Sequence, residues 1–180
     1  TLNENQEEEL FDYVKKKKLI YLSTPFSKKA AQKLYNMGVN GFKIGSGECN
    51  NFPLIDYISK FKKPIILSTG MNDMSSVRKS VNIIKKNGCK YALLHCVSLY
   101  PTPYNKLNLN RMLKIKKEFS LAPIGLSDHT LGIHASLAAV SLGANIIEKH
   151  FTSSKKWSGP DIPISIDKNE LKLLKTFSED

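Results

Sequence analysis

Short apolar segments recur along the chain at nearly regular intervals, and each one ends on or beside a serine, threonine or histidine. They occupy residues 19–24, 41–46, 64–69, 91–98, 122–127 and 145–151. Unbroken apolar runs of this length are typical of strands that are buried on both faces of a parallel sheet. The sequence therefore predicts six strands, each separated from the next by roughly twenty to thirty residues.

The segments between these strands show helical periodicity. Two of them, residues 76–88 and 133–145, place apolar residues at i, i+4 and i+7, and Gly88 and Gly143 supply stop signals. The apolar positions are Val77, Val81 and Ile84 in the first segment and Ile133, Leu137 and Val140 in the second. Alternating strands and helices predict βα units with helices covering a parallel sheet.

Polar residues gather where the predicted strands end. They are Thr24, Ser46, Glu48, Ser68, Ser98, Ser127, His129 and His150. Functional residues drawn from many strand ends are typical of a (β/α)8 TIM barrel, whereas a doubly wound nucleotide-binding fold usually carries Gly-x-Gly-x-x-Gly, which this sequence lacks. A complete barrel has eight units and about 250 residues. We therefore predict that residues 1–180 form an incomplete TIM-barrel domain of about six units, with the first two units absent.

Composition narrows the class of protein. Hydrophobic residues make up 41% of the chain and charged residues 24%, which is typical of a soluble globular domain, and no apolar run is long enough to span a bilayer. The net charge of +11 comes from lysine clusters near predicted helix ends, and we interpret it as a lysine-rich surface because no nucleic-acid-binding motif accompanies it. The three cysteines, Cys49, Cys89 and Cys96, form no Cys-x-x-Cys pair, which favours a reducing, cytoplasmic location.

Two histidines end neighbouring predicted strands. His129 and His150 occupy equivalent positions, and adjacent parallel strands lie about 4.8 Å apart, so both imidazoles could bind one divalent metal ion. Either histidine alone would more simply be a core residue. His95 lies out of phase with the strand-end residues and His134 begins a predicted helix, so we predict structural roles for both.

Lys43 lies inside a predicted strand. Strand alternation places it on the same face as Gly45, so it points into the barrel if Gly45 does. A cation there needs an anion, and the hydroxyls of Thr24, Ser68 and Ser127 could bind the same anion, for which phosphate is the natural choice.

Other chemistry remains open for these residues. Lys43 could instead form a Schiff base, as in barrel aldolases, whereas Lys149 alternates away if His150 points inward. Glu48 could hydrogen-bond a sugar or move a proton, or be an ordinary loop carboxylate. Pro160 and Pro163 stiffen the loop that would place Asp161 over the barrel mouth.

Several stretches resemble the sialic acid synthase family. They are "STPF", "FKIGSGE", "PIILSTGM", "LLHCVSLYPTPY", "GLSDHTLGI", "IEKHF" and "GPD", in that order, and the resemblance covers about residues 19 to 178. It implies a (β/α)8 barrel that condenses phosphoenolpyruvate with an N-acetylated hexose, such as N-acetylmannosamine or a related 6-deoxy diacetamido sugar.

The resemblance also implies residue roles. His129 and His150 would hold a divalent metal, most often Mn²⁺. Phosphoenolpyruvate would be bound by Thr24, Lys43, Ser46, Ser68, Ser98 and Ser127. The sugar would contact Glu48, Tyr100 and Asp161, and Lys43, Glu48 and Asp161 would be the catalytic residues. The family further implies a homodimer for the full-length protein.

The chain departs from the family pattern in two ways. Ser98 stands where some members have Asn, so its contact with phosphoenolpyruvate is in question. The family's first two βα units and its C-terminal antifreeze-like domain are not matched, so we expect the 180 residues alone to be inactive. Two alternatives stay open beside the synthase: a Schiff-base sugar aldolase that uses Lys43, and a non-catalytic basic module that binds nucleic acid.

Overall fold

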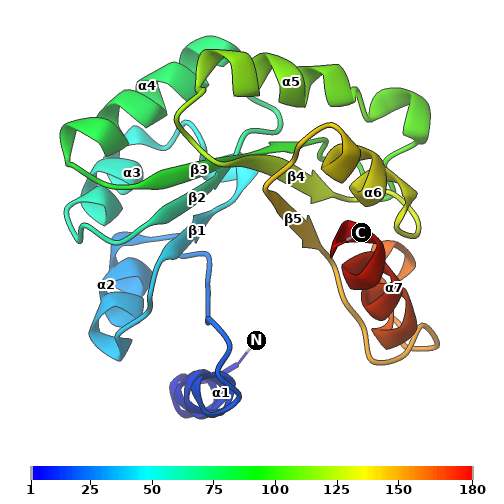
Figure 1. Ribbon diagram of the computed structural model, residues 1–180. Coiled ribbons are helices and arrows are strands. Elements are labelled where there is room, and N and C mark those ends of the chain that lie inside the picture. The colour runs from blue at the N-terminus through cyan, green and yellow to red at the C-terminus, as the bar shows by residue number, and fades with distance from the viewer. Residues whose placement is uncertain (1, 180) are drawn as a thin grey trace.

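The computed structural model describes residues 2–179, which form one curved parallel sheet covered by helices (Figure 1). The strands lie in chain order, β1-β2-β3-β4-β5, and every neighbouring pair is parallel. Their bounds are β1 Phe42–Ile44, β2 Ile65–Ser68, β3 Tyr91–Cys96, β4 Ile124–Asp128 and β5 Ile146–Lys149. The predicted parallel α/β architecture is confirmed as a curled half-barrel.

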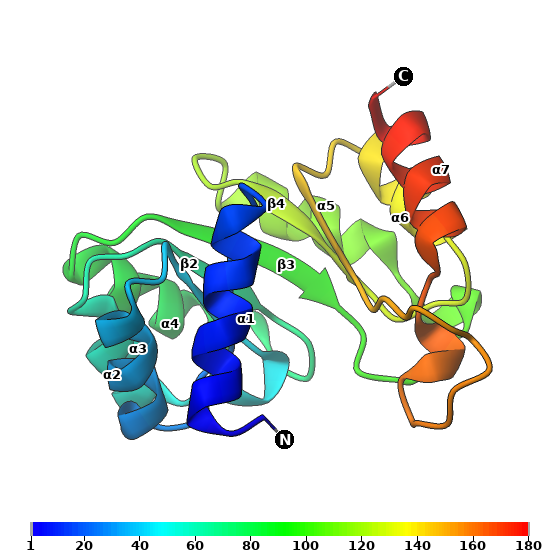
Figure 2. The same cartoon turned by 90° about the horizontal axis from the view of Figure 1, so that it is seen from below.

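Helices alternate with these strands. They are α1 Glu4–Lys16, α2 Lys28–Met37, α3 Phe52–Ser59, α4 Met74–Lys86, α5 Leu109–Glu118, α6 His134–Ser141 and α7 Lys168–Glu179, with short 3₁₀ turns at Ser46–Glu48, Tyr104–Lys106 and Ile162–Ile164. Helices α3 to α6 cover the convex face of the sheet, and α1 and α7 lie at its two ends (Figures 1 and 2). No helix in residues 2–179 has both the length and the apolar character that crossing a membrane requires.

The prediction of a strand at 19–24 is wrong. This segment is extended but irregular, and it approaches β1 through a hydrogen bond from the Lys43 N–H to the Ser23 carbonyl (3.1 Å). Leu19 and Ile20 are 66% and 71% exposed. A strand needs a continuous ladder of backbone hydrogen bonds. Tyr21 packs against Phe11 and the core, but the apolar side chains before it stay exposed, so this run gains little from a strand conformation.

The core lies between the sheet and the outer helices. Strand alternation directs Ile44, Leu67, Leu93 and Leu126 toward the helices, where all four are almost fully buried. Helix α4 follows the predicted pattern: Val77, Val81 and Ile84 are buried, and the Asp73 carboxylate accepts the Ser76 N–H at its start. The residues on the other face of each strand are therefore free to line the concave side.

The predicted face of α6 is wrong. Its buried residues are Ala135, Ser136 and Ala139, whereas Ile133, Leu137 and Val140 are only half-buried. Small side chains allow the helix to lie close to β4, and the Ser136 hydroxyl donates to the Asp128 carboxylate (2.6 Å). The face of α6 that packs against the sheet is therefore the one whose small side chains allow close contact, and not the one with the largest apolar side chains.

Candidate functional site

A pocket of about 290 Å³ lies at the carboxyl ends of the strands. It is lined by Lys43, Gly45, Ser46, Gly47, Ser68, Met71, Cys96, Ser98, Tyr100, Ser127, His129, Glu148 and His150. A smaller adjoining pocket adds Thr24 beside Lys43, Ser127 and Glu148. The structure thus brings together most of the side chains predicted at strand ends. A larger groove between α1, α2 and α3 contains none of them.

Lys43 supplies the positive charge of the pocket. It points into the concave side as predicted, its side chain is 12% exposed, and its Nζ donates to the Ser68 hydroxyl (2.8 Å). Because Ser68 accepts this bond, its own proton remains available for a ligand. Lys43 and Ser68 come from neighbouring strands in register, so the sheet itself fixes their separation.

Glu148 is a site residue that the sequence reasoning missed. Its Oε2 lies 3.4 Å from the Lys43 Nζ, and its Oε1 accepts from the Ser127 hydroxyl (2.7 Å). A signal was present, because Glu148 lies two residues before His150 in the same strand-like run and must share its face.

Gly70 lies directly behind two of the residues that line the pocket, Ser46 and Ser98. Its N–H donates to the Ser46 hydroxyl (3.0 Å), and the Ser46 hydroxyl also lies within hydrogen-bonding reach of the Cys96 side chain. A Cβ at Gly70 would lie 2.8 Å from the Ser46 Oγ and 2.9 Å from the Ser98 Oγ. Glycine is therefore required for the two hydroxyls to converge.

His129 and His150 lie side by side, with ring centroids 5.4 Å apart. The Nδ1 of His129 lies 2.9 Å from the Val97 carbonyl oxygen, so Nδ1 carries the proton and donates to that oxygen. Nε2 is then unprotonated, and its lone pair can accept a hydrogen bond or bind a metal ion. That Nε2 lies 3.1 Å from the Tyr100 hydroxyl. An orienting bond on the far nitrogen is the usual arrangement of a metal-binding histidine. His129 therefore fits a divalent ion, and His150 lies close enough to share it.

His129 and His150 would supply only two protein ligands to a metal ion. No cluster of three or more histidine, cysteine or acidic side chains suited to a metal occurs within residues 2–179. Substrate or water oxygens would have to complete the coordination of any ion held there.

The two imidazoles have opposite pKa shifts. Burial lowers the pKa of His150, outweighing the carboxylate of Asp161. Burial also disfavours the charged form of His129, but its hydrogen bonds with Cys96 and Val97 and the nearby charges together leave its pKa raised. The two rings therefore differ in environment although they occupy equivalent strand ends.

The predicted sugar-binding residues are only partly gathered. Tyr100 lines the pocket and stacks on the His129 ring at 4.1 Å. Asp161 lies outside, 56% exposed, with its Oδ2 3.7 Å from the His150 Nδ1. Glu48 also lies outside the lining and accepts a hydrogen bond from the Asn51 side-chain amide (2.6 Å). Both carboxylates follow strand ends near the mouth, so neither is placed far from it.

The remaining candidates have structural surroundings. His95 is buried, with its Nε2 2.8 Å from the Leu107 carbonyl, and His134 begins α6, as predicted. Lys149 is 4% exposed and pairs with Asp128 at 3.2 Å, which confirms that it alternates away from His150. The three cysteines are buried and unpaired, as expected without a disulfide framework.

A curled parallel α/β sheet with polar and charged side chains gathered at its strand ends has the layout of a barrel-type α/β protein. The chain belongs to the NeuB family, which it matches over residues 1–179. The resemblance to sialic acid synthases drawn from the sequence is thereby confirmed.

Individual relatives give the same result. The chain is 47% identical to the N,N'-diacetyllegionaminic acid synthase of Campylobacter jejuni, covering 93% of this chain and 51% of that protein. It is 34% identical to the N-acetylneuraminate-9-phosphate synthase of Mus musculus, covering 94% of this chain and 47% of that protein. The chain spans about half the length of the curated relatives that it matches.

A solved structure extends the comparison to the fold. The N-acetylneuraminic acid synthetase of Leptospira borgpetersenii serovar Hardjo-bovis, in complex with citrate, superimposes with a TM-score of 0.95 at 35% identity. The match covers 99% of this chain and 62% of that chain.

Proposed function

We propose that this chain carries the anion-binding and metal-binding side of an enzyme that condenses phosphoenolpyruvate with an N-acetylated hexose. The products are a nonulosonic (sialic-type) acid and phosphate. The observation that carries the proposal is the convergence of Lys43, four strand-end hydroxyls and the His129–His150 pair on one pocket.

The reaction forms one bond between carbon atoms and breaks one bond between carbon and oxygen. C3 of phosphoenolpyruvate attacks the open-chain sugar aldehyde, water adds to C2, and phosphate leaves with its bridging oxygen. The water oxygen forms a new bond to C2 and remains there as the ketone oxygen. Of the two protons of the water, one is taken by the aldehyde oxygen and the other leaves with the phosphate.

This chain's side chains would bind and orient the anion. The Lys43 ammonium and the Ser46 and Ser68 hydroxyls offer donors to phosphoenolpyruvate and to the phosphate as it departs. A divalent ion held by His129 and His150 would act as a Lewis acid toward the sugar carbonyl oxygen. The Tyr100 hydroxyl, 3.1 Å from the His129 Nε2, would hold the sugar beside this pair.

The proposal also covers which residues bind the acceptor sugar. The two relatives named above differ in their sugar acids. We assign sugar contacts to Tyr100, Glu48 and Asp161, and catalytic proton transfer to Glu48 and Asp161. Ser98 and Thr24 complete the phosphoenolpyruvate site with Ser127.

A Schiff-base aldolase fits the site less well. The Lys43 amine donates to Ser68 and lies beside the Glu148 carboxylate, an arrangement that suits an ammonium binding an anion. A nucleophilic lysine needs its neutral amine, usually in an apolar pocket or beside another cation.

Phosphate release tests the proposal directly. Because residues 1–180 alone are expected to be inactive, the assay uses the chain joined to the remaining units of the barrel. This full-length protein is incubated with phosphoenolpyruvate and a panel of N-acetylated hexoses, with Mn²⁺ or with a chelator. We expect release that requires one of the sugars and the metal. His129→Ala and His150→Ala should abolish metal-stimulated turnover and leave phosphoenolpyruvate binding largely unchanged, and full rates for both variants in chelator would exclude the metal role.

A further inference from the structure

A carboxylate occupies the middle of a site that must bind an anion. Glu148 belongs to β5 and lies between the two groups best suited to hold a negative charge. It pairs with the Lys43 Nζ at 3.4 Å and accepts the Ser127 hydroxyl proton at 2.7 Å. A fixed negative charge there opposes the binding of a second anion, so its presence needs a physical reason.

Each contact of Glu148 occupies a hydrogen-bond donor that a bound anion would otherwise use. The Ser127 hydroxyl has a single proton, and it points at Glu148 rather than into the pocket. Lys43 has three donors, of which one goes to Ser68 and another faces Glu148. The two oxygens of Glu148 therefore bridge a cation and a hydroxyl, as the oxygens of a bound carboxylate or phosphoryl group would.

Glu148 also has room to leave this position. Its side chain is 41% exposed, whereas the Lys43 side chain is 12% exposed. Lys149 faces away and is paired with Asp128. The charged and titratable groups that share the pocket with Glu148 are Lys43, Cys96, Tyr100, His129 and His150. A partly exposed ion pair is weak, typically below about 1 kcal/mol, so an incoming anion of higher charge can replace it.

We propose that Glu148 is an internal anion that fills the Lys43–Ser127 site until substrate displaces it. This inference rests on the proposed function, since it assigns a specificity role to one residue of the same pocket. Displacement frees both donors together. A singly charged anion gains little over the carboxylate that it replaces, whereas a multiply charged one such as phosphoenolpyruvate gains more. Because the displacement costs every anion about the same free energy, an anion of low charge binds too weakly to fill the site, and only a highly charged anion can displace Glu148.

The substitution Glu148→Gln tests this assignment. Glutamine has nearly the same shape and keeps an oxygen that can accept from Ser127, but it removes the charge that competes for Lys43. We expect inorganic phosphate and phosphoenolpyruvate to bind about three- to tenfold more tightly to the variant, as measured by calorimetry on the whole chain. Pyruvate, which carries one charge, should gain at least as much, so discrimination between it and phosphoenolpyruvate should not rise.

Glu118→Gln is the matched control. It removes a carboxylate that pairs with Arg78 on the outer helices, and its anion affinities should equal those of the parent. Equal or weaker anion binding by Glu148→Gln, with the control unchanged, would overturn the assignment and make Glu148 a structural partner of Lys43.

Measuring phosphate and phosphoenolpyruvate separately distinguishes a failure of this inference from a failure of the proposed function. Tighter phosphate binding by Glu148→Gln supports the internal anion even if no form of the protein binds phosphoenolpyruvate, which would refute only the proposed substrate. Tight phosphoenolpyruvate binding by the parent, with no gain in the variant for either probe, supports the substrate and refutes the role of Glu148.

Discussion

Single residues in the pocket are constrained by space as much as by chemistry. Gly70 donates its N–H to Ser46, and a methyl group at this position would also lie 3.0 Å from the Cys96 carbonyl oxygen. That oxygen belongs to the backbone and cannot rotate away. The pocket must therefore open to admit a side chain, and the hydroxyls of Ser46 and Ser98 must separate.

Gly70→Ala should consequently weaken anion binding while the chain still folds. We expect the affinity for phosphoenolpyruvate to fall by about tenfold, equivalent to about 1.4 kcal/mol, because converging donors are lost. Titration calorimetry measures the affinity, and thermal unfolding checks the fold. A variant that unfolds cooperatively and binds as tightly as the parent would show that the convergence of Ser46 and Ser98 is irrelevant.

His95 makes stability depend on pH. Burial lowers its pKa below the ordinary value, so the folded protein keeps the ring neutral where the unfolded chain would protonate it. Below about pH 6.5 the unfolded state binds the extra proton, so the free energy of unfolding should fall as the pH is lowered.

His95→Gln should reduce this decline, since glutamine can still donate to the Leu107 carbonyl but does not titrate. Urea denaturation between pH 7.5 and 5 measures it. The control is His134→Gln, which makes the same substitution at the exposed start of α6. Parallel curves for the parent and His95→Gln would mean that other groups account for the loss.

At the scale of elements, α6 shows that the most apolar residues of a helix are not always its most buried ones. Its largest apolar residues, Leu137 and Val140, are half-buried, while Ala139 is completely buried. Periodicity gives the angle between residues on a helix but does not say how close the helix lies to the sheet. That distance depends on the facing strand, which a single sequence does not place.

Enlarging the buried face of α6 should therefore destabilise the protein. Ala139→Leu is expected to cost about 1–3 kcal/mol of unfolding free energy, because it overpacks the space against the sheet. Ala138→Leu, on the exposed side of the same helix, should change stability by less than about 0.5 kcal/mol. Chemical denaturation of both variants measures the two costs, and an equal or larger cost for Ala138→Leu would contradict the burial of the Ala139 side of the helix.

For the molecule as a whole, apolar runs and strand-end polar residues were enough to predict the parallel sheet and most of the pocket. Lys43, Ser68, Ser127 and the two histidines converge because strand register is regular and side chains alternate. The segment at 19–24 could not be judged from its apolar content, since a strand also depends on its neighbours. Glu148 was missed because the sequence does not show which side chain of a distant strand will face it, and its ion-pair partner Lys43 belongs to β1.

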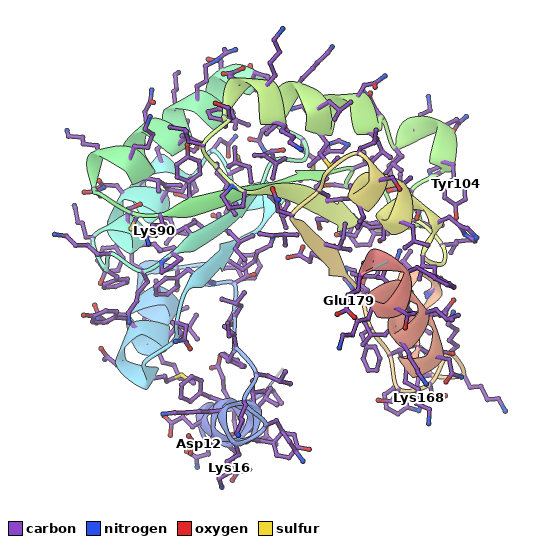
Figure 3. All side chains as sticks on the ribbon, in the orientation of Figure 1. Asp12, Lys16, Lys90, Tyr104, Lys168 and Glu179 are labelled. Atoms are coloured by element: carbon purple, nitrogen blue, oxygen red, sulfur yellow. The ribbon has the colours of Figure 1, made fainter. Side chains whose placement is uncertain are left out.

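The arrangement of the whole molecule also supplies a control for the charge of the site. Lys90 lies before β3, at the opposite end of the sheet from the strand-end pocket, and its side chain is exposed (Figure 3). Replacing it removes the same charge as replacing Lys43 without touching the pocket. Any difference in anion affinity between the two variants is therefore caused by the position of the lost charge and not by the change in net charge.

Titration of phosphoenolpyruvate into the parent chain, Lys43→Met and Lys90→Met tests the central claim most directly. We predict that the parent and Lys90→Met bind equally and that Lys43→Met binds at least tenfold more weakly, since a charge-assisted bond of about 1.5–3 kcal/mol is lost. Equal affinities for all three proteins would contradict a cationic pocket built by the strand ends around Lys43.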